Sequence, residues 1–118
     1  MTPRVSSFAA KFKQVRDVLL PHCHELHRSY EAHGFVDVTA LSTAELHVRD
    51  TLWWMEDELR PWLADERVVR WQRDGDEART TWTLLNEAAP AMEEALGRSN
   101  SLLRAIADEV TPHGDVFA

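Results

Sequence analysis

Histidines are the residues of this chain whose chemistry and spacing could build a reactive site. Four of the six fall in the segment HCHELHRSYEAH, residues 22–33. His24, His27 and Glu31 recur at steps of three and four, which places them on one face of an α-helix. Two imidazoles and a carboxylate can bind zinc or iron. The HExxH zinc signature is absent, however, because His27 follows Glu25 one place too early.

A structural role is the simpler interpretation of the same histidines. His22 and His33 fall on the apolar stripe of the helix expected here, so we expect them to be packed in the core. His24 and His27 would then be exposed side chains. On this interpretation the protein has no metal site, and we expect no cofactor.

An arginine followed by a histidine a turn or two later occurs twice in the same region. The pairs are Arg16 with His22 and Arg28 with His33. This order resembles the RNase motif of the HEPN helical bundles, which implies that Arg16 and His22 would form a catalytic pair across a dimer. The resemblance covers a short segment, and in that family the motif usually lies well past the first helix. A surface arginine beside a core histidine is the interpretation we prefer.

The most strongly patterned stretch predicts a helix over residues 43–65. Ser42 and Glu45 have the spacing of a capping box, in which the hydroxyl and the carboxylate satisfy free backbone amides. Apolar residues recur at alternating steps of three and four and predict a core-facing stripe. The stripe consists of Leu41, Ala44, Val48, Leu52, Met55, Leu59 and Trp62.

Two further amphipathic helices are expected on either side of this one. The first spans residues 3–33, continues across Pro21 and ends at a Gly34 cap. The third spans residues 87–111. Residues 112–118 are expected to form a loose tail.

The segment between the second and third helices has a different pattern. RVVRWQR and ARTTWTLL are rich in Val, Thr and Trp, and Asp74-Gly75 lies between them. Such a pattern predicts a β-hairpin over residues 67–84, with continued helix as the alternative. The expected fold is therefore mainly α with a minor β part. Three long helices form a bundle in one domain, residues 1–118, with the hairpin between the second and third.

Residues 59–96 resemble the wing and following helix of winged-helix regulators of the MarR and PadR type. The resemblance implies that four cations of the hairpin would lie near DNA: Arg67, Arg70, Arg73 and Arg79. The helix before the hairpin argues against this role, since it carries more acidic than basic residues and would repel phosphate. A winged-helix transcriptional regulator is therefore our alternative, and nucleic-acid binding is not expected.

Composition limits the classes of function. The net charge of −7 favours solubility and basic partners over nucleic acid. The single cysteine excludes an intrachain disulfide. No apolar run approaches the ~20 residues that span a bilayer, and no signal-peptide pattern is present. We therefore expect a cytoplasmic protein that does not enter a membrane.

Apolar residues outside the core stripe suggest how the protein acts. Leu46 and Trp53 lie together, well away from the stripe, and Trp54 lies on the other flank. With Asp57 they are the residues we expect to contact another protein. The sequence favours a non-enzymatic acidic protein that binds a protein partner, as an inhibitor, an immunity or antitoxin-like protein, or a homodimer.

Overall fold

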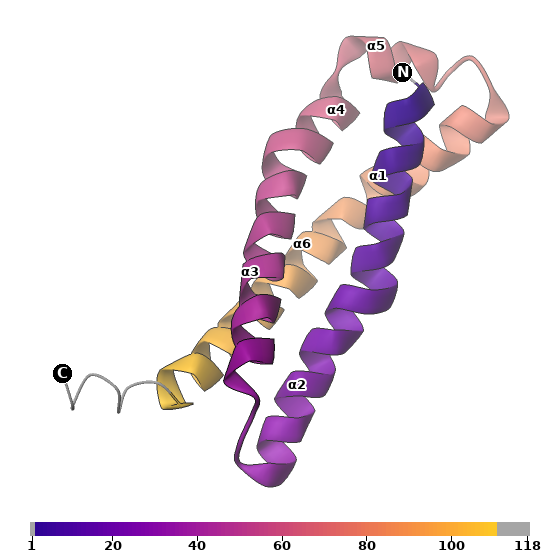
Figure 1. Cartoon of the computed structure of the whole chain (residues 1–118). Coiled ribbons are helices and arrows are strands. Elements are labelled where there is room, and N and C mark those ends of the chain that lie inside the picture. Colours follow the sequence, from indigo (N-terminus) through magenta and orange to yellow (C-terminus); the bar gives the residue numbers. More distant parts are fainter. Residues whose placement is uncertain (1, 111–118) are drawn as a thin grey trace.

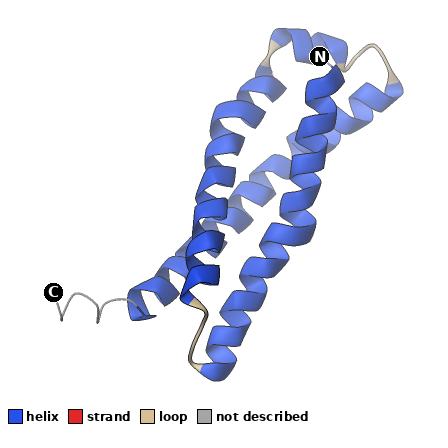
Figure 2. Ribbon diagram, viewed as in Figure 1, coloured by secondary structure: helices blue, strands red, loops and turns tan. Residues whose placement is uncertain are grey.

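The computed structural model describes residues 2–110, and all regular structure in that range is helical (Figures 1 and 2). Three rods run along the molecule: α1–η1–α2, then α3–η2–α4, then α6. The rod of α6 lies behind the other two in Figure 1 and packs against α2 and α3. The bounds are α1 Thr2–Gln14, η1 Val15–Leu19, α2 Leu20–His33, α3 Val38–Trp54, η2 Met55–Leu59, α4 Arg60–Ala64, α5 Glu66–Trp71 and α6 Asp76–Val110.

Two prolines are accommodated inside rods by wide π-helical turns, η1 and η2. Leu20 N–H donates to the Val15 carbonyl, and Arg60 N–H donates to the Met55 carbonyl. Each of these hydrogen bonds joins residues five apart in the chain, and its N–H donor belongs to the residue directly before a proline. Proline lacks an N–H, and its ring clashes with the carbonyl four residues earlier in a regular helix. The wider turn lets each rod continue, as expected for Pro21.

The segments around these prolines, VRDVLLP and MEDELRP, share an aspartate, a leucine and a proline at the same spacing. The leucines, Leu19 and Leu59, are both buried. The two aspartates, Asp17 and Asp57, are both exposed. Similar local sequences have thus produced the same local geometry in two rods.

The predicted β-hairpin at residues 67–84 is wrong. Its first half is the short helix α5 and its second half is the beginning of α6. The fold is mainly α with three long helices, as expected, but the β part does not occur among the described residues. Val68 is buried and Trp71 half-buried, three residues apart, which is helical rather than strand spacing.

Capping explains why this segment is helical. The Asp65 carboxylate accepts a hydrogen bond of 2.8 Å from Arg67 N–H and so begins α5. Asp74 and Gly75 lie in the turn between α5 and α6, so they join two helices instead of two strands. The third long helix consequently begins at Asp76, well before the predicted residue 87.

The second long helix also begins earlier than predicted. Asp37 caps it, because its carboxylate accepts from Thr39 N–H at 2.9 Å and from Ala40 N–H at 3.3 Å. Ser42 lies inside the helix, so the predicted capping box with Glu45 is wrong.

The end of the first rod agrees with prediction. Gly34 takes a left-handed conformation with φ of 74° and donates its N–H to the Tyr30 carbonyl at 2.7 Å. The predicted tail, residues 112–118, lies outside the described residues.

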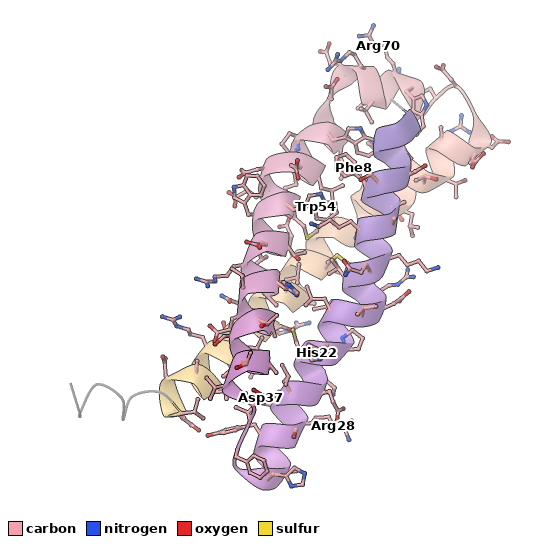
Figure 3. The ribbon with its side chains drawn as sticks, viewed as in Figure 1. Phe8, His22, Arg28, Asp37, Trp54 and Arg70 are labelled. Atoms are coloured by element: carbon pink, nitrogen blue, oxygen red, sulfur yellow. The ribbon has the colours of Figure 1, made fainter. Side chains whose placement is uncertain are left out.

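Aromatic rings hold the rods together toward α4 and α5. The Phe8 ring lies 4.9 Å from that of Trp62 and 5.8 Å from that of Trp54, measured between centroids. Trp62 in turn lies 6.3 Å from Trp71. Figure 3 shows Phe8 and Trp54 facing each other between α1 and α3. These rings fix which side of α3 faces inward, and therefore which side faces out.

Candidate protein-binding surface

The side of α3 opposite the core carries two large apolar residues. Leu46 is 50 % exposed and Trp53 is 60 % exposed, while Val48 on the inner side is completely buried. Leu46 and Trp53 are seven residues apart, which is about two helical turns, so they lie nearly in line along the helix. No described element covers these two side chains, and they remain open to solvent.

Among the described residues, Trp53 is the tryptophan that has no aromatic or hydrogen-bond partner. Trp54 and Trp62 both pack against Phe8, and Trp71 packs against Trp62. Trp82 donates its indole N–H to the Leu63 carbonyl at 3.2 Å. Within the described part of the chain, the Trp53 ring makes no hydrogen bond or aromatic contact. Four of the five tryptophans therefore support the fold, and Trp53 does not.

The other two residues expected at the binding surface, Trp54 and Asp57, have different environments in the structure. Trp54 is only 4 % exposed and belongs to the core, where the Lys11 ammonium also lies 5.2 Å from its ring centroid. It positions α3 and is not available to a partner. Asp57 is exposed and lies one turn beyond Trp53, on the same side of the rod.

Two opposite charges lie between Leu46 and Trp53. Arg49 and Asp50 are both exposed. Neither side chain makes a hydrogen bond or an ion pair with any described residue, whereas Arg60 further along the rod binds Glu93. Asp50 lies on the flank toward α1, where it lines a surface pocket with Lys11, Gln14 and Leu19. We use the name α3 outer face for Leu46, Arg49, Trp53 and Asp57.

The proposed metal ligands form only part of a site. His27 Nε2 lies 3.0 Å from Glu31 Oε1, so these two residues of the predicted set do meet. His24 is exposed. Across residues 2–110, no three His, Cys, Asp or Glu side chains are close enough to hold a metal ion.

The prediction that His22 and His33 are core residues is wrong, since both are exposed. Cys23 takes the buried position instead, at 2 % exposure. The π-turn at η1 is the physical reason: it adds a residue to one turn, which rotates the following helix and brings the next residue inward. Burial raises the pKa of the Cys23 thiol.

Neither arginine of the RNase-like pattern pairs with its histidine among the described residues. Arg16 Nε lies 2.8 Å from Asp17, and this contact lowers the pKa of the Asp17 carboxyl. Arg28 lies 3.7 Å from Glu25. Figure 3 shows His22 and Arg28 at separate positions along α2. The sequence pattern of Arg16 and His22 is therefore not matched by a contact between these two side chains in the structure.

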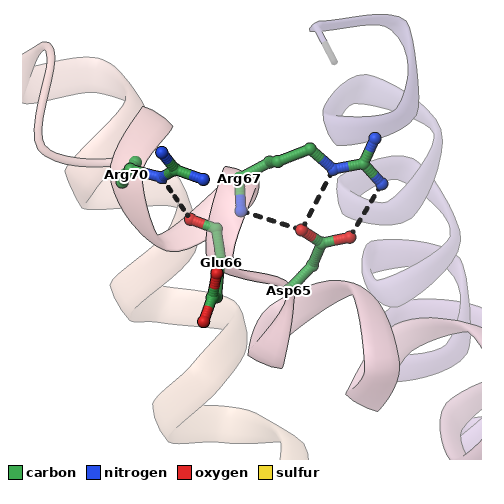
Figure 4. A network of polar contacts seen from close by, with 4 residues as sticks. All are labelled: Asp65, Glu66, Arg67 and Arg70. Carbon is green, nitrogen blue, oxygen red and sulfur yellow. Dashed lines mark hydrogen bonds and ion pairs between the residues drawn. The ribbon is translucent and has the colours of Figure 1, made fainter.

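The arginines expected on a wing lie on α5, in the turn after it and at the beginning of α6. Figure 4 shows Arg67 bound to Asp65, with Arg67 Nη2 3.0 Å from Asp65 Oδ2, and Arg70 Nε donating to the Glu66 carbonyl at 3.4 Å. The guanidinium of Arg67 lowers the pKa of the Asp65 carboxyl.

The remaining two wing candidates are similarly placed. Arg79 lies at the beginning of α6, 3.5 Å from Asp76, and also donates to the carbonyl of Arg73 at 3.4 Å. No strand pair is formed by residues 67–84, so these cations have no wing to present to DNA.

Comparison with known proteins gives no relative from which a site could be transferred. No protein-family model, curated protein or solved structure matches the chain. No described helix combines the length and apolar character needed to cross a membrane. The function has to be inferred from the chain's own residues.

Proposed function

We propose that this protein is a non-enzymatic binding protein whose contact surface is the α3 outer face. The observation that carries the proposal is the exposed pair of Leu46 and Trp53, two turns apart on the side of α3 that no other described element covers. Large apolar side chains aligned in this way are typical of a helix that packs against a partner.

The chemistry of the α3 outer face suits a protein partner. Tryptophan and arginine are the residues most enriched at binding hot spots, and Arg49 lies one turn from Trp53. Burying Leu46 and Trp53 is worth roughly 3–6 kcal/mol before the cost of association is subtracted. These two side chains would supply part of the free energy of a contact, and the surrounding surface would have to supply the rest.

Such a contact fits regulatory roles in which binding is the activity. An inhibitor, an immunity or antitoxin-like protein, and a self-associating regulator all belong to this class. We expect the protein to act in the cytoplasm, and the buried free thiol of Cys23 suits a reducing compartment.

Site-specific photo-crosslinking in cells of the native host tests the proposal. A photoreactive amino acid at position 53 should give a defined crosslinked product. The same group at position 84 should not, because Leu84 is similarly exposed, at 55 %, but lies on α6. Products of equal yield from both positions, or none from position 53, would contradict a binding role for the α3 outer face.

A further inference from the structure

We infer that the partner at the α3 outer face is a basic amphipathic helix of another protein. Its apolar side chains cover Leu46 and Trp53, and a lysine or arginine of the same helix reaches the acidic turn η2 that follows. This inference rests on the proposed function and adds the chemistry of the partner. Three features carry it: the charge of η2, the contrast between η2 and η1, and the unpartnered acceptor groups around η2.

Three successive carboxylates lie in η2, at the end of the α3 outer face: Glu56, Asp57 and Glu58. All three residues are exposed, and none of their carboxylates makes a hydrogen bond or an ion pair with a described residue. Arg60, the next cation along the rod, already binds Glu93. The surface beside Trp53 therefore carries negative charge that the described part of the chain leaves uncompensated.

The other π-helical turn shows that this geometry does not require an excess of acid. VRDVLLP and MEDELRP both form the wide turn before a proline. Where η2 has Glu56 and Glu58, η1 has Arg16 and Val18. Arg16 lies 2.8 Å from Asp17, so η1 compensates its own carboxylate. The carboxylates of η2 are not needed to form the turn, and they are available to bind a cation.

The wide turn also leaves a backbone acceptor beside these carboxylates. Arg60 N–H donates to the Met55 carbonyl, and Pro61 has no N–H. The Glu56 carbonyl therefore has no donor four or five residues later in its own helix. A carbonyl oxygen in this position adds to the attraction for the N–H groups of an ammonium or a guanidinium.

A hollow between η2 and α6 offers the partner's cation a place. It has a volume of about 390 Å³ and is lined by Leu52, Glu56, Arg60 and Glu93. One oxygen of Glu93 accepts from Arg60, while the other, Oε1, is buried without a hydrogen-bond partner. An unsatisfied buried acceptor is unfavourable, and a second donor in the hollow would share this carboxylate with Arg60. The aliphatic stem of a lysine or arginine would pack on Leu52.

The shape and the overall charge of the surface favour a basic helix. Leu46 and Trp53 lie in line over about two turns, which suits the apolar stripe of a helix packed alongside α3. Arg49 is the cation of the α3 outer face, and it lies before Trp53, away from η2. The partner's cations therefore belong opposite η2 rather than opposite Arg49. The net charge of −7 likewise favours association with a basic partner.

Fluorescence anisotropy with two labelled synthetic peptides tests the inference. The basic probe is an amphipathic helix of leucine, alanine and lysine, and the acidic probe has glutamate at every lysine position. The wild type should bind the basic probe at least about tenfold more tightly than the acidic one. Trp53→Ala should weaken binding of the basic probe roughly thirtyfold, because exposed tryptophans are typical hot-spot residues.

Glu56→Arg tests the role of the acidic turn. It gives η2 the arginine–aspartate pair of η1, so the turn should still form, as circular dichroism would verify. Binding of the basic probe should fall roughly tenfold. Glu56→Gln removes the charge without reversing it and should weaken binding roughly threefold, which keeps the test valid if the arginine variant does not fold.

Glu87→Arg is the matched control for net charge. Glu87 is an exposed glutamate of α6 that makes no ion pair with a described residue. The variant changes the net charge by the same amount as Glu56→Arg. At physiological salt it should alter binding of the basic probe by less than about twofold, because screening limits the reach of an exposed charge.

Four results would overturn the inference. They are no preference of the wild type for the basic probe, binding unaffected by Trp53→Ala, binding unaffected by the Glu56 variants, and an equal loss with Glu87→Arg and Glu56→Arg. The proposed function is judged separately, by photo-crosslinking. A product at position 53 but not at 84, in which the captured segment has no lysine or arginine, would leave the proposed function standing and contradict a basic partner.

Discussion

Trp53 and Trp54 are neighbours in the chain but belong to opposite sides of α3. Trp54 packs against Phe8 and is 4 % exposed, whereas Trp53 is 60 % exposed and meets no other described aromatic ring. Successive residues of a helix point about 100° apart, which is enough to put one ring in the core and the next in solvent. Residue type therefore does not determine the role of a tryptophan here; its position around the helix does.

The comparison extends along the whole α3–η2 rod. The inner side presents a continuous apolar row, with Val48, Met55 and Leu59 fully buried. The outer side alternates apolar and charged residues that have few intramolecular partners. The inner side holds the bundle together, and we propose that the outer side binds a partner. Substitutions on the two sides should therefore affect different measurements.

The largest expected difference is in stability. Trp54→Ala should lower the free energy of unfolding by about 3–5 kcal/mol, because it leaves a cavity beside Phe8. Trp53→Ala should change it by no more than about 0.5 kcal/mol. Urea unfolding followed by circular dichroism measures both, at a low chain concentration so that self-association does not contribute.

The reverse order of effects would break the comparison. If Trp53→Ala were as destabilising as Trp54→Ala, Trp53 would be part of the folding core and the α3 outer face would not be free to bind. Lys11→Met is a useful control, since it removes the cation above the Trp54 ring while keeping the volume of the side chain. It should cost roughly 1 kcal/mol or less.

The inner side of this rod could be predicted because its pattern is long and regular. Seven apolar residues from Leu41 to Trp62 recur with helical spacing, and six of the seven are buried in the structure. The exposure of Leu46 and Trp53 follows from the same spacing. A long amphipathic pattern reports which side of a helix packs inward, without any knowledge of what it packs against.

The errors occurred where a few residues decide between two local structures. Asp74-Gly75 can turn a hairpin or join two helices, and the capping of α5 by Asp65 favours helix. His22 and Cys23 compete for one core position, and the π-turn gives it to Cys23. Neither outcome is visible in hydrophobic spacing, because both depend on local backbone hydrogen bonds.

Substitutions at the beginning of α3 should have an effect of intermediate size on the free energy of unfolding. Asp37→Ala should lower the free energy of unfolding by about 1 kcal/mol, because it removes the acceptor for two backbone amides at the first turn. Ser42→Ala should have little effect or be slightly stabilising, since Ser42 lies inside the helix and alanine is the better helix former. Thermal unfolding of the two variants beside the wild type measures the difference. The opposite ranking would restore the predicted capping box.

The smallest expected effect concerns Asp65, the half-buried residue that links the α3–η2–α4 rod to α5. Its side-chain hydrogen bond with Arg67, and then the Arg67 amide, hold the pKa of the carboxyl below its ordinary value of 3.8. Because the folded state prefers the ionised form, this contact contributes stability above the ordinary pKa. That contribution is lost as the pH falls through the lower pKa of the folded state. Solvent screening keeps the contribution small.

Two variants separate this effect from general acid sensitivity. Arg67→Gln should move the pKa of Asp65 back toward its ordinary value, as measured by NMR titration of the carboxyl carbon. Asp65→Asn should lose less stability than the wild type when the pH is lowered from about 6 to about 2.5. If the wild type and Asp65→Asn respond identically to acid, the ionised carboxylate is not what begins α5. The backbone of the turn after Ala64 would then have to account for the helix that replaced the predicted hairpin.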